Sequence, residues 1–161
     1  AIRLVEPGGL GEVGYLDVRN RDSERIIEAK KMNLYDIMKL TKGDSIAMEL
    51  TNKMKVSFEI GYPAIVDAYR ETKDISKAIL QGFMNILSMV PDSLIARKRG
   101  RRTADKVSEE ARSILETGFD RERLASFDKK LRDKNNALNP GATADLTASS
   151  LMIAVLNGLR P

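Results

Sequence analysis

Three acidic residues at predicted helix boundaries are the side chains of this sequence best suited to chemistry. Asp44 follows a glycine, Asp92 follows a proline, and Asp145 comes shortly after a Pro-Gly pair. An acid at such a boundary usually caps a helix, because its carboxylate accepts hydrogen bonds from the free N–H groups of the first turn. If the three boundaries converge in the fold, the same carboxylates form a cluster able to hold Mg²⁺. The sequence leaves both interpretations open.

The basic residues are concentrated beside one of these acids. Five cations lie within six positions, namely Arg97, Lys98, Arg99, Arg101 and Arg102. The net charge of the chain is only +4, so the remainder is close to neutral. A single basic cluster suits a small polyphosphate, because one arginine guanidinium can donate hydrogen bonds to two phosphate oxygens. Nucleic-acid-binding proteins usually spread their basic residues along a face. A solvated loop or a weak nucleic-acid contact is the alternative.

The segment 139–146, Asn-Pro-Gly-Ala-Thr-Ala-Asp-Leu, predicts a chain break followed by a helix start. Asn139 or Thr143 would cap that helix, and backbone N–H groups would point toward an anion. Asp145 would then lie in the first turn, where a carboxylate is favoured by the helix dipole. An ordinary capped helix is the alternative interpretation.

Composition restricts the chemistry further. The chain of 161 residues has no His, Cys or Trp. It therefore has no disulfides and no thiolate nucleophile, and any metal must be held by oxygen ligands, which favours Mg²⁺ or Mn²⁺. Proton transfer would use Asp, Glu, Lys or Tyr. We find no run of 18 apolar residues and no signal-peptide pattern, so we expect a cytoplasmic protein without a membrane segment.

Helical periodicity dominates the chain from residue 33 onward, and no strand-like alternation occurs. The pattern predicts helices that begin near residues 33, 44, 74, 104, 120 and 143, while residues 12–30 are predicted as loop or short turns. The last helix, 143 to about 157, is apolar on nearly all sides and should be buried. We therefore expect one all-α domain over 1–161, a single helical bundle of about five to seven helices with a buried C-terminal helix.

Four sequence blocks together resemble the triphosphoribosyl-dephospho-CoA synthase family. They are 139–146, the stretch Pro-Asp-Ser-Leu-Ile-Ala-Arg-Lys-Arg-Gly at 91–100, Pro-Gly-Gly-Leu-Gly at 7–11 with Asp17, and Gly-Asp-Ser-Ile-Ala at 43–47. Their details are closer to an archaeal and bacterial branch without an established acceptor than to the citrate-lyase branch. The resemblance begins in the middle of the family pattern, so we expect the C-terminal portion of a longer protein, inactive without its N-terminal half.

The resemblance implies an ATP-dependent transferase of prosthetic-group biosynthesis. In the family, the triphosphoribosyl group of ATP is joined to a hydroxyl of 3′-dephospho-CoA, and adenine is released. Adenine departure builds positive charge on the ribose, which nearby carboxylates would stabilise. By resemblance, Asp92 and Asp145 would serve the ribose or Mg²⁺, and Asp44 would be a catalytic base or a metal ligand.

The resemblance also assigns the phosphate and backbone contacts. The candidate substrate-binding residues are Arg97, Lys98, Gly8, Gly9, Asn139, Gly141 and Thr143. Two alternatives stay open: a helical nucleic-acid-binding or interaction module that uses residues 97–102, and a family member that binds nucleotide without catalysis. We consider nucleic acid the less expected partner, and the oligomeric state is left open.

Overall fold

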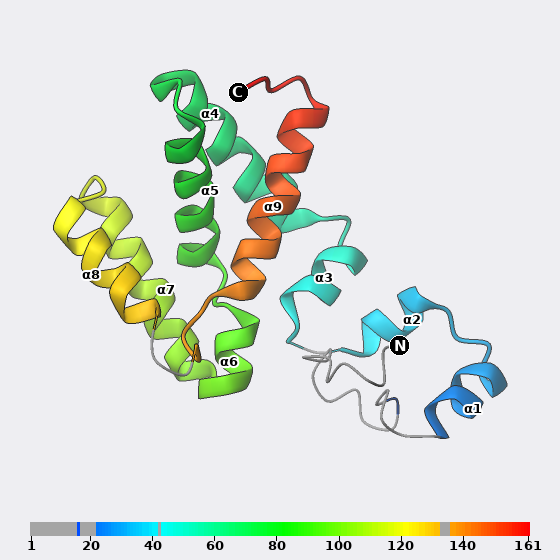
Figure 1. Ribbon diagram of the computed structural model, residues 1–161. Coiled ribbons are helices and arrows are strands. Elements are labelled where there is room, and N and C mark those ends of the chain that lie inside the picture. The colour runs from blue at the N-terminus through cyan, green and yellow to red at the C-terminus, as the bar shows by residue number, and fades with distance from the viewer. Residues whose placement is uncertain (1–15, 17–21, 42, 133–135) are drawn as a thin grey trace. The chain divides into compact units, whose positions relative to one another are not determined.

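The computed structural model describes residue 16 and residues 22–41, 43–132 and 136–161 (Figure 1). Every regular element in these ranges is a helix, so the predicted all-α class is confirmed. The described ranges hold nine α-helices and one short π-helix, more than the five to seven expected. The chain divides into two compact units between Lys53 and Met54, and we describe each unit by itself.

The first unit contains three short helices, α1 (Asp22–Ala29), α2 (Leu34–Leu40) and α3 (Ser45–Thr51). The prediction of a loop for the segment that forms α1 was wrong. This helix has only eight residues, and acids in its first turn favour it electrostatically. Such a short polar helix leaves too little apolar periodicity to be recognised in the sequence.

Local capping residues start α2 as the sequence predicts. The Asn33 side chain accepts a hydrogen bond from the Asp36 N–H at 3.0 Å, and the Asp36 carboxylate accepts one from the Asn33 N–H at 3.0 Å. This reciprocal capping box satisfies two backbone donors at once.

The second unit contains η3 (Ser57–Gly61, a π-helix), α4 (Tyr62–Thr72), α5 (Ile75–Met89), α6 (Ser93–Arg99), α7 (Arg101–Glu116), α8 (Arg121–Leu131) and α9 (Gly141–Leu156). Helix α5 packs against α4, α7 and α9 and lies between the α7–α8 pair and α9 (Figure 1). Gly61 permits close packing of η3 on α9, because a Cβ there would lie 2.0 Å from the Ser150 Oγ. Helices α4, α7 and α9, together with η3, thus surround α5.

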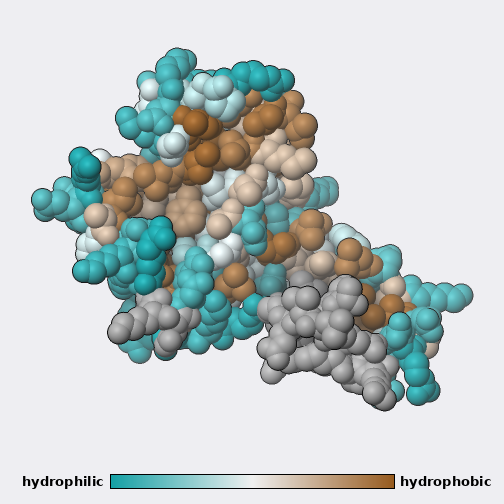
Figure 2. All heavy atoms as spheres, viewed as in Figure 1, coloured by the Kyte–Doolittle hydropathy of each residue, from teal (hydrophilic) through white to brown (hydrophobic). Residues whose placement is uncertain are grey.

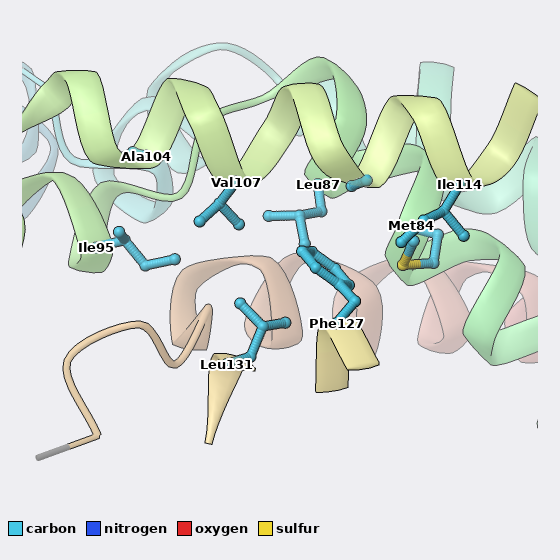
Figure 3. Packing of buried hydrophobic residues seen from close by; sticks show 9 residues of the cluster. Met84, Leu87, Ile95, Ala104, Val107, Ile114, Phe127 and Leu131 are labelled. Carbon is cyan, nitrogen blue, oxygen red and sulfur yellow. The ribbon is translucent and has the colours of Figure 1, made fainter. Parts of the chain in front are cut away.

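The main hydrophobic core joins α5, α6, α7 and α8. Its buried members are Met84, Leu87, Ile95, Ala104, Val107, Ala111, Ile114, Phe127 and Leu131. Figure 3 shows these side chains pointing toward one another, with Phe127 of α8 in their midst. Because Ile95 of α6 and Ala104 of α7 both belong to this core, it fixes the two helices that carry the basic residues of 97–102.

Helix α9 is buried along one face only. Leu146 and Ile153 are buried, whereas Met152 is 64% exposed and Leu156 is 74% exposed. Figure 2 shows hydrophobic surface over the C-terminal half of this helix. The expectation of a buried C-terminal helix therefore holds for one face. Within the described ranges, no single helix is long and apolar enough to cross a membrane; only α5 and α6 together, bent by 52°, meet that test.

Candidate active site

The two most specific sequence blocks meet at the side chain of Asp92. Its Oδ1 accepts hydrogen bonds from the Leu94 N–H at 2.9 Å and the Ile95 N–H at 3.1 Å, which caps α6. Its Oδ2 accepts hydrogen bonds from the Thr143 N–H at 2.7 Å and the Thr143 hydroxyl at 2.8 Å. Asp92 is only 1% exposed. One carboxylate thus joins the first turns of two helices whose bonded residues are 51 positions apart, and we call this arrangement the Asp92 junction.

The start of α9 depends on this junction because it has no cap of its own. The predictions that Asn139 or Thr143 caps the helix were wrong: the N-cap position is Pro140, and no side chain near it in sequence accepts a first-turn N–H. Asn139 is exposed, and its backbone carbonyl accepts a hydrogen bond from the Gly141 N–H at 3.0 Å. The capping carboxylate comes instead from the distant Asp92, which no local sequence rule could reveal.

Gly141 allows α6 and α9 to approach each other. A Cβ at this position would lie 2.7 Å from the Leu94 Cδ1, closer than real Cβ contacts. Figure 1 shows the start of α9 beside α6, and the two helices are in contact. Gly141 therefore supports the Asp92 junction by keeping the interface between these helices clear.

Asp145 lies in a different environment from Asp92. It is the fifth residue of α9, so the prediction that it lies in the first turn was wrong. It is exposed, and its carboxylate has no hydrogen-bond or ion-pair partner among the described residues. Of the two acids predicted in this region, Asp145 is the one open to a ligand.

Mg²⁺ fits the described acids only as an ion held largely by substrate and water. No group of three or more acidic side chains that could hold a metal occurs in the ranges that the structure describes. Mg²⁺ in phosphate-transfer enzymes often takes only one or two carboxylates, together with phosphates and waters. Asp145 can supply one such carboxylate, while both oxygens of Asp92 already accept hydrogen bonds.

The basic residues lie at the other end of α6. We call residues 97–102 the basic segment. Arg97, Lys98 and Arg99 form the last turn of α6, and Arg101 and Arg102 begin α7. The prediction of a basic loop was therefore wrong, because a single residue, Gly100 with φ of +86°, separates the two helices. All five cations are exposed.

The start of α7 is an electropositive helix end without compensation. Gly100 offers no capping side chain, and no acid lies in the first turn. The backbone N–H groups of Arg101 and Arg102 have no protein partner in the part of the chain that the structure describes. The Arg101 guanidinium pairs with Asp105 at 2.9 Å, and the Arg102 guanidinium has no described partner. Cations at a helix N-terminus repel its dipole, so this end of α7 favours a bound anion.

Lys98 has a different role from its neighbours. Its ammonium donates a hydrogen bond to the backbone carbonyl of Asn136 at 3.1 Å. Lys98 therefore ties the end of α6 to the segment that leads into α9, a contact that the sequence did not indicate. Arg97 and Arg99 also interact with other residues, whereas Arg102 is the cation of this segment with the greatest freedom to meet a ligand.

The remaining predicted site residues lie elsewhere. Asp44 caps α3 by accepting hydrogen bonds from the Ile46 and Ala47 N–H groups at 3.0 Å each. It belongs to the first unit, so its convergence with the acids of the second unit stays a prediction. Gly8, Gly9 and Asp17 lie outside the described residues.

A pocket of about 550 Å³ lies away from these residues. It is lined by α4, α5, the turn between α7 and α8 and the start of α8, and Gln81, Phe119 and Arg121 are among its walls. None of the predicted site residues that the structure describes lines it. The sequence carried no signal for this pocket, because it forms only where α4 and α5 pack together and meet residues 119–124.

Comparison with known proteins gives two findings and one negative result. The family model for ATP:dephospho-CoA triphosphoribosyl transferase matches residues 1–161. A crystal structure from Archaeoglobus fulgidus, provisionally assigned as a triphosphoribosyl-dephospho-CoA synthase, is similar at a TM-score of 0.73 and 34% identity. The similarity covers 89% of this chain and 61% of that one, so the chain spans less than two thirds of that protein. No curated protein matches significantly.

The family match and the fold agree with the sequence blocks. The match extends over the entire chain and includes the segments that form the Asp92 junction and the basic segment. The Archaeoglobus fulgidus protein is 34% identical to this chain over the matched region, so the likeness extends to the sequence as well as the fold. This chain belongs to the ATP:dephospho-CoA triphosphoribosyl transferase family.

Proposed function

We propose that this chain takes part in the transfer of the triphosphoribosyl group of ATP to an acceptor hydroxyl, with release of adenine and with Mg²⁺ present. The acceptor is 3′-dephospho-CoA or a related nucleotide. The observation that carries the proposal is the family match over residues 1–161. The exposed cations at the end of α6 opposite to the Asp92 junction support it, because a retained triphosphate needs several positive groups.

The basic segment binds the triphosphate. The uncapped N-terminus of α7 offers the Arg101 and Arg102 N–H groups, and the Arg102 guanidinium adds a planar pair of donors. An anion there would remove the repulsion between these arginines and the helix dipole. The triphosphate therefore binds at a helix start that has no capping side chain and no acid in its first turn.

Asp145 serves the other half of the substrate. It is an exposed carboxylate on the helix that begins beside α6, and it either orients the ribose or supplies one oxygen to Mg²⁺. When bound, Mg²⁺ neutralises phosphate charge and orients the triphosphate. A negative carboxylate also stabilises the positive charge that develops on the ribose as adenine leaves.

Calorimetric titration of the chain with ATP in the presence and absence of Mg²⁺ tests the proposal. We expect Mg²⁺-dependent binding of ATP that weakens in Asp145→Asn and is unchanged in Glu122→Gln, which removes an exposed carboxylate from α8. Equal affinity of the two variants for ATP would contradict the role of Asp145. Absence of ATP binding in the wild-type chain would contradict the proposed function.

Two further measurements separate the alternatives. Tight oligonucleotide binding that falls steeply with salt, together with weak ATP binding, would favour the nucleic-acid module. An assay of adenine release distinguishes a catalytic chain from one that only binds nucleotide. Adenine release would support the transferase chemistry, whereas ATP binding without release would identify a chain that binds nucleotide only.

A further inference from the structure

We propose that Asp92 is a positioning residue, which fixes the orientation of α9 through Thr143, and that it does not ligate the metal. The Asp92 junction is a feature of the second unit alone, so its geometry stands independently of any ligand. The consequence for catalysis rests on the proposed function. The proposal divides two acids that look equivalent in the sequence into one that organises the fold and one that meets substrate.

The hydrogen-bonding capacity of Asp92 carries the proposal. An ionised carboxylate has about four lone-pair positions. Donors from Leu94, Ile95 and Thr143 use both oxygens at 2.7–3.1 Å, with two donors on each oxygen. The residue is also 1% exposed. A metal ion would have to displace one of these donors and reach a carboxylate that solvent barely touches.

Charge supports the same assignment. The Asp92 carboxylate lies at the N-terminal ends of both α6 and α9, where two helix dipoles stabilise it. Its negative charge also compensates the start of α9, so that end attracts a phosphate less strongly than the uncompensated start of α7. The junction thereby leaves the basic segment as the stronger anion site.

The orientation of α9 decides where Asp145 points. Thr143 lies two residues before Asp145, and successive residues of an α-helix are rotated by about 100°. A shift of α9 by one residue against α6 would therefore turn the Asp145 carboxylate away from its present direction. Two donors from Thr143 to one fixed oxygen prevent such a shift.

A double-mutant cycle tests whether Asp92 acts through Thr143. Asp92→Asn retains one oxygen for capping α6 but turns an amide donor toward the Thr143 N–H and hydroxyl. Thr143→Val removes the hydroxyl donor with little change of shape, and Thr143→Ser keeps it. We expect Thr143→Val to lower Tm by about 5 °C, since hydrogen bonds to charged groups are the stronger ones. Thr143→Ser should stay close to wild type.

Non-additivity is the expected result of the cycle. The double variant should lose clearly less Tm than the sum of the two single losses, because each change damages the same bond. Additive losses would overturn the proposed coupling. Thr143→Val removes a single hydroxyl donor and provides the test by itself where Asp92→Asn does not fold; an unchanged Tm in Thr143→Val would overturn the proposal.

Mg²⁺ dependence separates positioning from metal ligation. In titrations of Mg²⁺ at fixed ATP, both Thr143→Val and Asp92→Asn should weaken ATP binding. The half-saturating Mg²⁺ concentration of each variant should stay within about twofold of the wild-type value. Loss of a direct carboxylate ligand should raise that concentration roughly tenfold or more, as we expect for Asp145→Asn if it holds the ion. A tenfold rise in Asp92→Asn alone would overturn the proposal. If the wild-type chain binds no ATP, the proposed function is wrong, and the Tm cycle still decides whether Asp92 joins the helices.

Discussion

The two ends of α6 use charge in opposite ways. At its start, the buried carboxylate of Asp92 accepts four hydrogen bonds and bridges to α9. At its end, the basic segment presents exposed cations and an uncapped start of α7. The helix has seven residues, so these regions lie only about 10 Å apart along it. Burial and hydrogen bonding make the Asp92 charge structural, whereas exposure leaves the cations of the basic segment accessible to substrate.

The comparison teaches that a charged residue in a family motif need not touch substrate. A buried acid with every lone pair used contributes mainly to stability, whereas an exposed cation near a like-charged helix end contributes mainly to binding. Variants at the two ends of α6 should therefore differ in which measurement they change.

Asp92→Ala should be the most destabilising of the variants considered. It leaves donors of Leu94, Ile95 and Thr143 unsatisfied in a buried place, and we expect a loss of about 3–5 kcal/mol in the free energy of unfolding. Urea unfolding measures this loss. Asp120→Ala is the matched control: it removes an exposed N-cap with one bond to the Arg123 N–H and should cost about 1 kcal/mol. Equal losses would remove the contrast between buried and exposed caps.

The double variant Arg101→Gln/Arg102→Gln should weaken ligand binding without lowering stability. We expect the Kd for Mg²⁺-bound ATP to rise about 10- to 100-fold, because charge-assisted hydrogen bonds to phosphate are lost. Tm should stay level or rise slightly, since two cations leave the positive end of α7. Calorimetry and thermal melts provide both values. Lys129→Gln, an exposed cation on α8, should change neither, and a similar loss of affinity there would indicate unspecific charge effects.

Alanine substitutions at Gly100 and Gly141, which lie near opposite ends of α6, should lower stability by different mechanisms. Gly100 has φ of +86° and ψ of 152°, so Gly100→Ala should lose roughly 1–3 kcal/mol through backbone strain. No neighbouring atom lies within 4 Å of the added Cβ. Gly141→Ala should instead lose stability by a clash with the Leu94 Cδ1, at 2.7 Å.

Leu94→Val distinguishes these mechanisms because valine lacks the clashing methyl group. In urea unfolding, this background should recover part of the loss in Gly141→Ala and none of the loss in Gly100→Ala. Recovery of both would contradict the assignment of strain to Gly100.

Ser108→Ala should increase stability by about 1 kcal/mol, since it removes a buried hydroxyl that has no partner among the described residues. Ser108 is 3% exposed, similar to Asp92, yet its hydroxyl forms no hydrogen bond in the described part of the chain. Ser150→Ala is the control, because the buried Ser150 hydroxyl donates to the Leu146 carbonyl at 2.7 Å. In urea unfolding, the free energy of unfolding should be higher than wild type for Ser108→Ala and lower for Ser150→Ala. A change of the same sign in both variants would contradict the role of the hydrogen bond.

Asp74→Asn should give the smallest effect and depend on pH. The Lys77 N–H, with help from the Ser76 N–H, holds the pKa of the exposed Asp74 carboxyl below its ordinary value of 3.8. Because the folded pKa is lowered, the charge stabilises the fold above its unfolded pKa and this contribution disappears as pH falls through the folded pKa. Thermal melts should show a small Tm deficit of the variant at pH 7 that narrows only below about pH 4. A deficit independent of pH would contradict this account.

Local sequence rules accounted for much of the secondary structure. The caps at Asn33, Asp44, Asp74 and Asp120 lie where the sequence placed helix starts, because each acts on backbone groups two or three residues away. The same rules failed at α1, which is short and polar, and at the start of α9, where the capping carboxylate comes from the distant Asp92. Local rules describe a helix only when its stabilising partner is nearby in the chain.

The sequence by itself determined the helical class, the family and the residue types available for chemistry, since periodicity, capping and motif spacing are properties of neighbouring residues. Only the tertiary structure decided that Asp92 is buried against Thr143 and that Asp145 is exposed. Burial and hydrogen-bond saturation depend on contacts between segments 51 residues apart. Such contacts arise from packing of whole helices, and no spacing within either segment encodes which acid becomes enclosed.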